Sequence, residues 1–411
     1  MKKNNKAMHL FVLIMFFLFF SPIFNNSFRL NIQKKIFLSE NDVSNYQILN
    51  GVKYDVAINY TVTRTSVSNQ EYYYKIPRLN NRTPYSNLTS YTPPYQESEL
   101  LFNKITGSND DPHYLVDRFN NTYDLFNATL SKGDSLTFSQ NYIVRLNEIS
   151  FQNVDYDDIG EYNYSDIIFD LYCNRSVQYY NTSDEDLIYA YENEIGILKS
   201  DNPIEIAKKI CDWIAQNIQY EIQVPERGAS WAYKEKKGDC SEYADLLITL
   251  LRIGNIPARK VTGFVLSNQI PFKPNIGDVY TFYFNDSGDN LLGHAWVEYF
   301  VPNIGWIACD PTWYSAGGDY FNKIDYQRLG FNIGQWFYYP PSDNVSEYIN
   351  PPIGYPTTTD YSYILKITVL ETFYAQDYLP YIILGISLAV IAIGVGYYVI
   401  RRRKKTREIV Y

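Results

Sequence analysis

The chain has 411 residues, of which 46% are hydrophobic and 20% are charged, a composition that supports packed cores and excludes a disordered or fibrous protein. Its formal net charge is -9, but nine of the 36 basic residues and only one of the 45 acidic residues lie in 1–24 and 379–411. Residues 25–378 therefore carry 27 basic and 44 acidic side chains, a net charge of -17. This charge disfavours nucleic acid and anionic lipid as partners.

Two apolar segments predict how the chain meets a membrane. Residues 1–24 contain three lysines followed by an apolar stretch, which is typical of a signal peptide or a signal anchor. Residues 379–400 are uncharged and long enough to cross a bilayer as a helix. The basic residues 401–411 then predict a cytoplasmic tail. We expect a single-pass cell-membrane protein, or a two-pass protein if the first segment is not cleaved, with the bulk of the chain outside the cytoplasm.

Asn-x-Ser/Thr triplets agree with an extracytoplasmic glycoprotein. They begin at Asn25, Asn59, Asn81, Asn87, Asn120, Asn127, Asn163, Asn174, Asn181, Asn285 and Asn344. In a chain so rich in asparagine many of these triplets arise by chance, so they support the topology without establishing it.

Residues 40–160 are predicted to form a β-sandwich-like domain. Apolar residues alternate with polar ones along 52–62 and again along 136–146, which is the pattern of half-buried strands. The Lys-Gly-Asp turn at 132–134 predicts a hairpin before the second of these strands. The Pro- and Asn-rich residues 77–95 predict a loop.

Helical periodicity follows in a domain predicted over 164–340. Apolar stripes and end signals predict helices that begin near Ser183, at Asn202-Pro203 and at Cys240, the last ending at Gly254. Strand patterns return at 257–266, 279–285, 294–301 and 305–313. All six tryptophans lie between 213 and 336, so this domain is expected to be the functional one. Residues 341–378 predict a stalk, with a last strand near 361–373.

Three side chains offer a nucleophile, a base and an orienting acid. A cysteine nucleophile needs a base to form its thiolate, and the base needs an acceptor that orients it. His294 is the one histidine of the tryptophan-rich region, and it opens a strand. Cys240 falls in the first turn of a helix, whose dipole favours a thiolate, and Asp310 ends the strand after that of His294. Gly238 leaves room for a substrate carbonyl, and N–H groups at the helix start are available to an oxyanion.

The stretches "KKGDCSEYADLLITLLRIGNIPARKVTGF" (236–264) and "GHAWVEYFVPNIGWIACDPTW" (293–313) resemble the transglutaminase-like superfamily, in its membrane-anchored prokaryotic or archaeal form. The resemblance implies an α+β, papain-like core between the predicted β-sandwich and a C-terminal transmembrane helix. It implies Cys240 as nucleophile, His294 as base and Asp310 as orienting acid, acting on amides through a thioester. Asn255 departs from the glycine that often stands in the family's turn.

Two tryptophans join Gly238 as candidates for oxyanion or substrate contacts. Trp231 is suggested because the family often places an aromatic or amide side chain upstream of the nucleophile, and Trp296 because it belongs to the His-Ala-Trp motif. No cofactor and no metal are expected.

Three alternatives stay open. Cys173, Cys211, Cys240 and Cys309 are available for disulfides in an oxidising compartment, although the spacing favours Cys211 and Cys309 as small buried apolar side chains. A zinc site built from the three candidate catalytic residues would be an unusual ligand set. The domain is also compatible with a non-catalytic peptide-binding or adhesion protein.

The sequence therefore predicts a membrane-tethered, extracytoplasmic thiol enzyme that acts on peptide or glutamine amide bonds. The expected reaction is that of a peptidase or amidohydrolase, or acyl transfer of the transglutaminase type. The expected partners are a peptide or protein substrate and the membrane, through the C-terminal helix. Nucleic acid is not expected as a partner.

Overall fold

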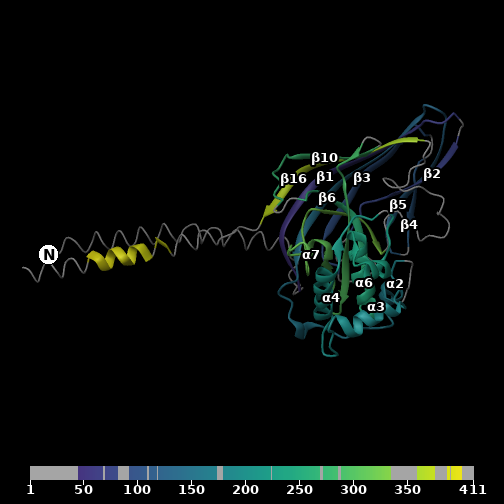
Figure 1. Cartoon of the computed structure of the whole chain (residues 1–411). Coiled ribbons are helices and arrows are strands. Elements are labelled where there is room, and N and C mark those ends of the chain that lie inside the picture. The colour runs from purple at the N-terminus through teal and green to yellow at the C-terminus, as the bar shows by residue number, and fades with distance from the viewer. Residues whose placement is uncertain are drawn as a thin grey trace, which may run out of the picture. The chain divides into compact units, whose positions relative to one another are not determined.

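The computed structural model describes residues 45–67, 70–81, 92–108, 111–117, 119–173, 179–223, 225–268, 272–285, 288–334, 359–374, 387–388 and 390–399. Residues 45–374 belong to one compact unit, whose elements are labelled in Figure 1, and the residues from 375 on belong to another. The first unit is a mixed α/β structure with helices on one side and a wide sheet on the other.

The widest sheet has seven strands, and it joins distant parts of the chain. Its order is β11 (Gly288–Asp289), β10 (Val279–Asn285), β16 (Thr359–Tyr374), β1 (Gln47–Arg64), β6 (Ser135–Ser150) and β14 (Lys323–Ile324), with β3 (Gln96–Thr106) also paired to β6. Along β1 and β6 buried and partly exposed residues alternate, which confirms the two predicted strands. Their inner faces build an apolar core.

A three-stranded sheet of β2 (Gln70–Pro77), β5 (Thr122–Leu130) and β4 (His113–Val116) packs into the same core. The predicted hairpin at 132–134 is wrong, because β5 and β6, on either side of this turn, belong to different sheets. The Gly133 N–H donates to the Arg64 carbonyl, and the Arg64 N–H donates to the Asp134 carbonyl. These bonds tie the turn to the end of β1, so it carries the chain from one sheet to the other.

A four-stranded sheet lies at the centre of the unit, in the order β13 (Gly305–Cys309), β12 (Leu292–Val301), β9 (Ala258–Val265) and β15 (Arg328–Gly334). It contributes to two cores: Val261 and Val297 pack with the helices, while Phe264 and Leu329 pack with the wide sheet. Strands buried on both faces explain why β9, β13 and β15 are buried along their whole length.

Helices cover the other face of this central sheet. They are α2 (Ile167–Tyr172), α3 (Glu185–Tyr189), α4 (Pro203–Asn217), α5 (Ala229–Glu235), α6 (Cys240–Ile253) and α7 (Pro311–Ser315), together with the 3-10 turn η1 (Tyr156–Asp158) and the π turn η2 (Ala190–Glu194) that follows α3. Two short parallel strands, β7 (Gln219–Tyr220) and β8 (Lys237–Gly238), lead into α6.

The start signals of the helices decide where they begin. Asn202 caps α4 with a complete capping box and a proline at the first turn, as predicted. The first predicted helix begins one residue later than expected, because Asp184 rather than Ser183 accepts the N–H groups of its first turn.

Residues 341–358 and 375–378 of the predicted stalk lie outside the described residues, and the structure confirms the last strand predicted near 361–373, which spans 359–374. These residues form β16, which pairs with β1 on one side and β10 on the other, because Tyr361, Tyr363 and Leu365 alternate into the core. Strands from beyond residue 160 thus complete the sheet predicted for 40–160, while the domain boundary near 160 stays a prediction.

The predicted signal segment 1–24, the predicted tail 401–411 and residues 379–386, 389 and 400 of the predicted span lie outside the described residues, as do 82–91 of the predicted loop. Of the span, 387–388 and 390–399 are described and helical. Within the described part of the chain, no helix combines the length and the hydropathy that crossing a membrane requires.

Candidate active site

Cys240 is the first residue of α6, in the position that the sequence predicts. The Asp239 carboxylate accepts the Ser241 N–H at 2.9 Å, and the Glu242 carboxylate accepts the Asp239 N–H at 2.9 Å. This capping box fixes the backbone on both sides of the cysteine. The partly exposed thiol therefore lies at the positive end of the helix dipole, in a first turn whose Ser241 and Glu242 N–H groups are capped by Asp239.

The same two carboxylates hold the loop between β7 and α5. Asp239 accepts the Gln223 N–H at 3.0 Å, and Glu242 accepts the Arg227 N–H at 2.7 Å. Burial raises the pKa of Glu242 to about 7, against the opposing effect of these backbone donors. Glu242 also explains why residue 238 is a glycine, because a Cβ at residue 238 would lie 2.4 Å from the Cβ of Glu242. The substrate contact predicted for Gly238 stays a prediction.

A buried ion cluster joins the loop between β7 and α5 to helix α6. Lys260 forms ion pairs of 2.6 Å with both Glu226 and Asp245, and the three side chains are almost fully buried. Removing one partner of such a cluster would leave an uncompensated buried charge, so the cluster fixes the loop against the helix that begins with the nucleophile.

His294 and Asp310 meet on neighbouring strands. Strands β12 and β13 are antiparallel, with Val297 opposite Cys309, so the start of one lies beside the end of the other. The His294 Nε2 atom lies 2.6 Å from Asp310 Oδ2, and the second oxygen of Asp310 accepts the Trp313 N–H at 3.1 Å. Both side chains are buried, so this bond is shielded from water.

His294 and Asp310 each stabilise the charged form of the other. Burial lowers the pKa of His294, but the Asp310 carboxylate outweighs burial, and a hydrogen bond with Cys240 adds to the rise, to about 9. Burial alone would raise the pKa of Asp310, but His294 and Arg328 hold it well below its usual range. Because Nε2 faces Asp310, Nδ1 is the nitrogen that is free to exchange a proton with the thiol. The structure thus brings the three predicted catalytic residues together.

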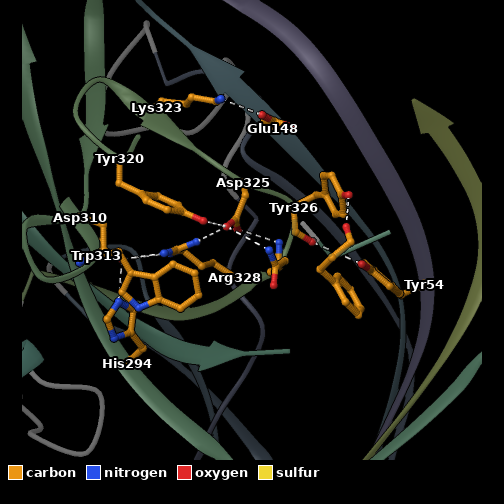
Figure 2. Close-up of polar contacts among 12 residues, drawn as sticks. Tyr54, Glu148, His294, Asp310, Trp313, Tyr320, Lys323, Asp325, Tyr326 and Arg328 are labelled. Carbon is orange, nitrogen blue, oxygen red and sulfur yellow. Dashed lines mark hydrogen bonds and ion pairs between the residues drawn. The ribbon is translucent and has the colours of Figure 1, made fainter. Parts of the chain in front are cut away.

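Three further polar residues extend this group, and the sequence analysis missed them (Figure 2). The Arg328 guanidinium donates to Asp310 Oδ2 from Nη2 at 2.7 Å and from Nε at 3.2 Å. Its Nη1 forms an ion pair of 2.5 Å with Asp325, which also accepts the Tyr320 hydroxyl at 2.7 Å. An arginine at the start of the mostly apolar strand "RLGFNIG" is a signal that could have pointed to a buried ion pair.

Tyr220 is a second residue that the sequence analysis missed. It ends β7, beside the strand that leads into the nucleophile. Burial, then the neighbouring Cys240 and Asp239, raise the pKa of its hydroxyl to about 12, so it stays a neutral donor at physiological pH. A hydroxyl donor next to a thiol nucleophile can stabilise a developing oxyanion.

The two candidate tryptophans have different surroundings. Trp296 lies on β12 two residues after His294, with its ring stacked 6.2 Å from the imidazole. Its indole N–H is buried without a hydrogen-bond partner among the described residues. Trp231 lies on α5, and the side-chain cations of Arg227 and Lys237 approach its ring. The oxyanion or substrate role of both tryptophans stays a prediction.

The four cysteines are free thiols, and two of them meet. The sulfur atoms of Cys211 in α4 and Cys309 in β13 lie 3.4 Å apart in the interior, a contact that their spacing did not indicate. Among the described residues, no group of three or more His, Cys, Asp or Glu side chains is arranged to hold a metal ion.

Part of the chain matches a known family. Residues 192–311, which include Cys240, His294 and Asp310, match the family model of the Transglutaminase-like superfamily. This match confirms the resemblance in this part of the chain.

Two curated relatives match part of the chain. The protein YebA of Bacillus subtilis, described as uncharacterised, is 27% identical over 120 residues, and the Protein-glutamine gamma-glutamyltransferase of Pseudomonas aeruginosa is 32% identical over 106 residues. The matches cover 27% and 24% of this chain, but only 16% and 14% of the relatives.

Among solved structures, one of a Cytophaga hutchinsonii protein, described as a candidate cysteine protease, is 15% identical with a TM-score of 0.45 and covers 81% of this chain and 97% of its own. The periplasmic domain of TgpA from Pseudomonas aeruginosa is 16% identical with a TM-score of 0.29, over 62% of this chain and 89% of that domain.

Proposed function

Because residues 192–311 are a transglutaminase-like domain, we propose that this chain is a thiol enzyme that acts on peptide or glutamine amide bonds through a thioester. The observation that carries the proposal is the contact series from Cys240 through His294 to Asp310. It supplies a nucleophile at a helix start, a base with one nitrogen free, and a buried carboxylate that fixes the other nitrogen.

Each group then has one task. His294 holds the proton of the thiol while the Cys240 thiolate attacks the amide carbon, and the oxygen of the tetrahedral intermediate takes a negative charge. We assign donation to that oxygen to the Cys240 N–H, which the Asp239 cap does not take up, and to the Tyr220 hydroxyl. His294 then gives its proton to the departing amine, which leaves an acyl group on Cys240.

The second half of the reaction decides the product. Water that attacks the thioester gives hydrolysis, and an amine gives transfer to a new amide. One of the relatives is named Protein-glutamine gamma-glutamyltransferase, which supports transfer as an outcome. We place the domain outside the cytoplasm, tethered through the segment 379–400, on the sequence pattern alone.

The test follows both the thiol and the amide. Full-length protein in detergent is labelled with iodoacetamide at neutral pH, and ammonia release from glutamine peptides is measured with and without an added primary amine. We expect rapid labelling of Cys240, slow labelling of the buried Cys173, and ammonia release that is lost in Cys240→Ala. Incorporation of the amine would assign transfer, and its absence would assign hydrolysis.

Two outcomes would overturn the proposal. A Cys240 that labels only after reduction would be a disulfide cysteine and not a nucleophile. A Cys240 that labels rapidly while no amide is turned over across a broad peptide pool would make the domain a peptide-binding module.

A further inference from the structure

Arg328 connects the candidate triad to a second carboxylate. It lies at the start of β15, beyond the segment that matches the family model, and its side chain is buried. Its guanidinium bridges Asp310 and Asp325, and the rings of Trp313 and Tyr320 flank it at 4.4 Å and 4.5 Å (Figure 2). The two rings and the two carboxylates leave the cation little freedom to move.

The charges along this line alternate in sign. An imidazolium at His294 faces the Asp310 carboxylate on one side and the Cys240 thiolate on the other. Asp310 is shared with the Arg328 cation, which in turn faces Asp325 and the Tyr320 hydroxyl. Because Arg328 and His294 both bind the same oxygen of Asp310, each cation weakens the hold of that oxygen on the other.

We propose that Arg328 and Asp325 are positioning residues that set the pH at which His294 gives up its proton. Arg328 offsets part of the Asp310 charge and so destabilises the imidazolium, while Asp325 offsets Arg328 and so restores part of that stability. This inference rests on the proposed function only in that it gives His294 the role of acid and base.

The test measures His294 directly, so it does not depend on turnover. The chain has three histidines, and NMR titration of histidine-labelled protein follows each ring, with His113→Gln used to assign the spectrum. Arg328→Met removes the cation and should raise the pKa of His294 by roughly one unit. Asp325→Asn leaves Arg328 paired with Asp310 alone and should lower the pKa of His294. The expected shift is roughly half a unit, because the Asp325 carboxylate is farther from His294 than the Arg328 guanidinium is.

Two matched variants separate charge from structure. Arg328→Lys keeps the charge without the planar guanidinium, so it should leave the His294 pKa near that of the wild type while lowering the rate of Cys240 alkylation. Asp319→Asn removes an exposed carboxylate that pairs with Lys323, and it should leave the titration unchanged. If the folded Arg328 and Asp325 variants move the pKa in the same direction, or not at all, the proposal is wrong whether or not the protein is an enzyme.

The pair Cys211 and Cys309 carries a second, independent inference. Each thiol is buried, their sulfur atoms lie 3.4 Å apart, and they join helix α4 to strand β13 across 98 residues of sequence. A small movement of the side chains would bring the sulfurs within bonding distance. Cys309 directly precedes Asp310, so a bond there would fix the end of the strand that holds the candidate acid.

We infer that Cys211 and Cys309 form a disulfide when the chain folds in the presence of a small disulfide oxidant such as oxidised glutathione. One thiolate attacks the oxidant and releases a glutathione thiolate, and the other then attacks the mixed disulfide and releases the second. The two cysteines lose two electrons and two protons, and the oxidant takes up both. In the folded protein burial raises the pKa of Cys309, so the bond should form during folding and not afterwards.

The test refolds full-length Cys240→Ala protein from denaturant with oxidised glutathione or with a reductant, and maps the cysteines by alkylation and mass spectrometry. We expect a peptide that links Cys211 to Cys309 only in the oxidised sample, and a higher Tm for that sample. Cys309→Ala should lose both effects, whereas Cys173→Ala should lose neither. Free Cys211 and Cys309 after oxidative refolding, or a bond from either to Cys173, would overturn the inference.

Discussion

The two sides of the candidate triad are held in different ways. On the nucleophile side, Asp239 and Glu242 fix Cys240 through backbone N–H groups, and the capping box spans four consecutive residues. On the acid side, Asp310 is fixed by His294 and Arg328 through charge, and these residues come from three different strands or strand ends. A local motif therefore orients the nucleophile, whereas the acid depends on contacts that exist only after the chain has folded.

The difference predicts that the acid side is the more sensitive to loss of charge. Asp310→Asn keeps the shape but removes the charge that stabilises the imidazolium, so we expect kcat/KM for amide turnover to fall by about 10³ to 10⁴. Asp319→Asn, an exposed carboxylate nearby, is the matched control. A fall of less than about tenfold would place the orienting role elsewhere.

On the nucleophile side, Glu242 should make the stability of the protein depend on pH. Its pKa of about 7 in the folded state exceeds the ordinary value of about 4.3, so its contribution is complete below about pH 4 and is lost as the pH rises to about 7. Glu242→Gln should remove a decline of at most about 4 kcal/mol in the free energy of unfolding over this range. Urea unfolding of both proteins between about pH 4 and about pH 8 measures it.

Glu205→Gln is the matched variant for this measurement, because Glu205 occupies the same capping-box position in α4 but is not fully buried. Equal pH profiles for wild type and Glu242→Gln would mean that burial of the Glu242 carboxyl does not cause the pH dependence of stability.

Gly238 tests how closely the cap is packed. An added methyl group would lie 2.4 Å from the Cβ and 2.9 Å from the Cγ of Glu242, so Gly238→Ala should cost about 1–3 kcal/mol of stability. Gly293→Ala adds the same methyl group where nothing lies within 4 Å, and it should cost less. Chemical denaturation compares the two, and similar costs would contradict the close packing of Gly238 on Glu242.

The smallest predicted effect compares two helix caps: Asp239, next to the candidate nucleophile, and Asn202, which stabilises α4. Asp239→Ala and Asn202→Ala each remove a helix cap, so each should cost about 1 kcal/mol. Only Asp239→Ala should also slow the alkylation of Cys240, because Asp239 caps the helix that begins at Cys240, whereas Asn202 caps α4. If both variants slow alkylation equally, the cap does not position the thiol.

The same division explains what the sequence could predict. The alternation along β1, the Asn202 cap and the helix start at Cys240 are local patterns, and the structure confirms them. The grouping of Cys240 with His294 was predictable because His294 is the one histidine in its region.

Apart from the turn at 132–134 and the cap at Asp184, the main misses are contacts between residues that are distant in sequence. Nothing near Arg328 indicates that it faces Asp310, and nothing near Cys211 indicates Cys309. Strand β16 could be predicted as a strand, but its place between β1 and β10 could not, because alternation tells which face is buried and not which strand is the neighbour.

The place of β16 also sets an order of events during synthesis. It pairs with β1 along most of its length, from Asn50 opposite Tyr374 to Arg64 opposite Thr359, so the partners are made roughly 300 residues apart. Such distant pairing is slow to form, and until it forms one edge of β1 offers unpaired backbone groups to other chains. A ribosome must therefore deliver nearly the whole of residues 45–374 before the first long strand can close its sheet, and we expect a nascent chain to need protection until then.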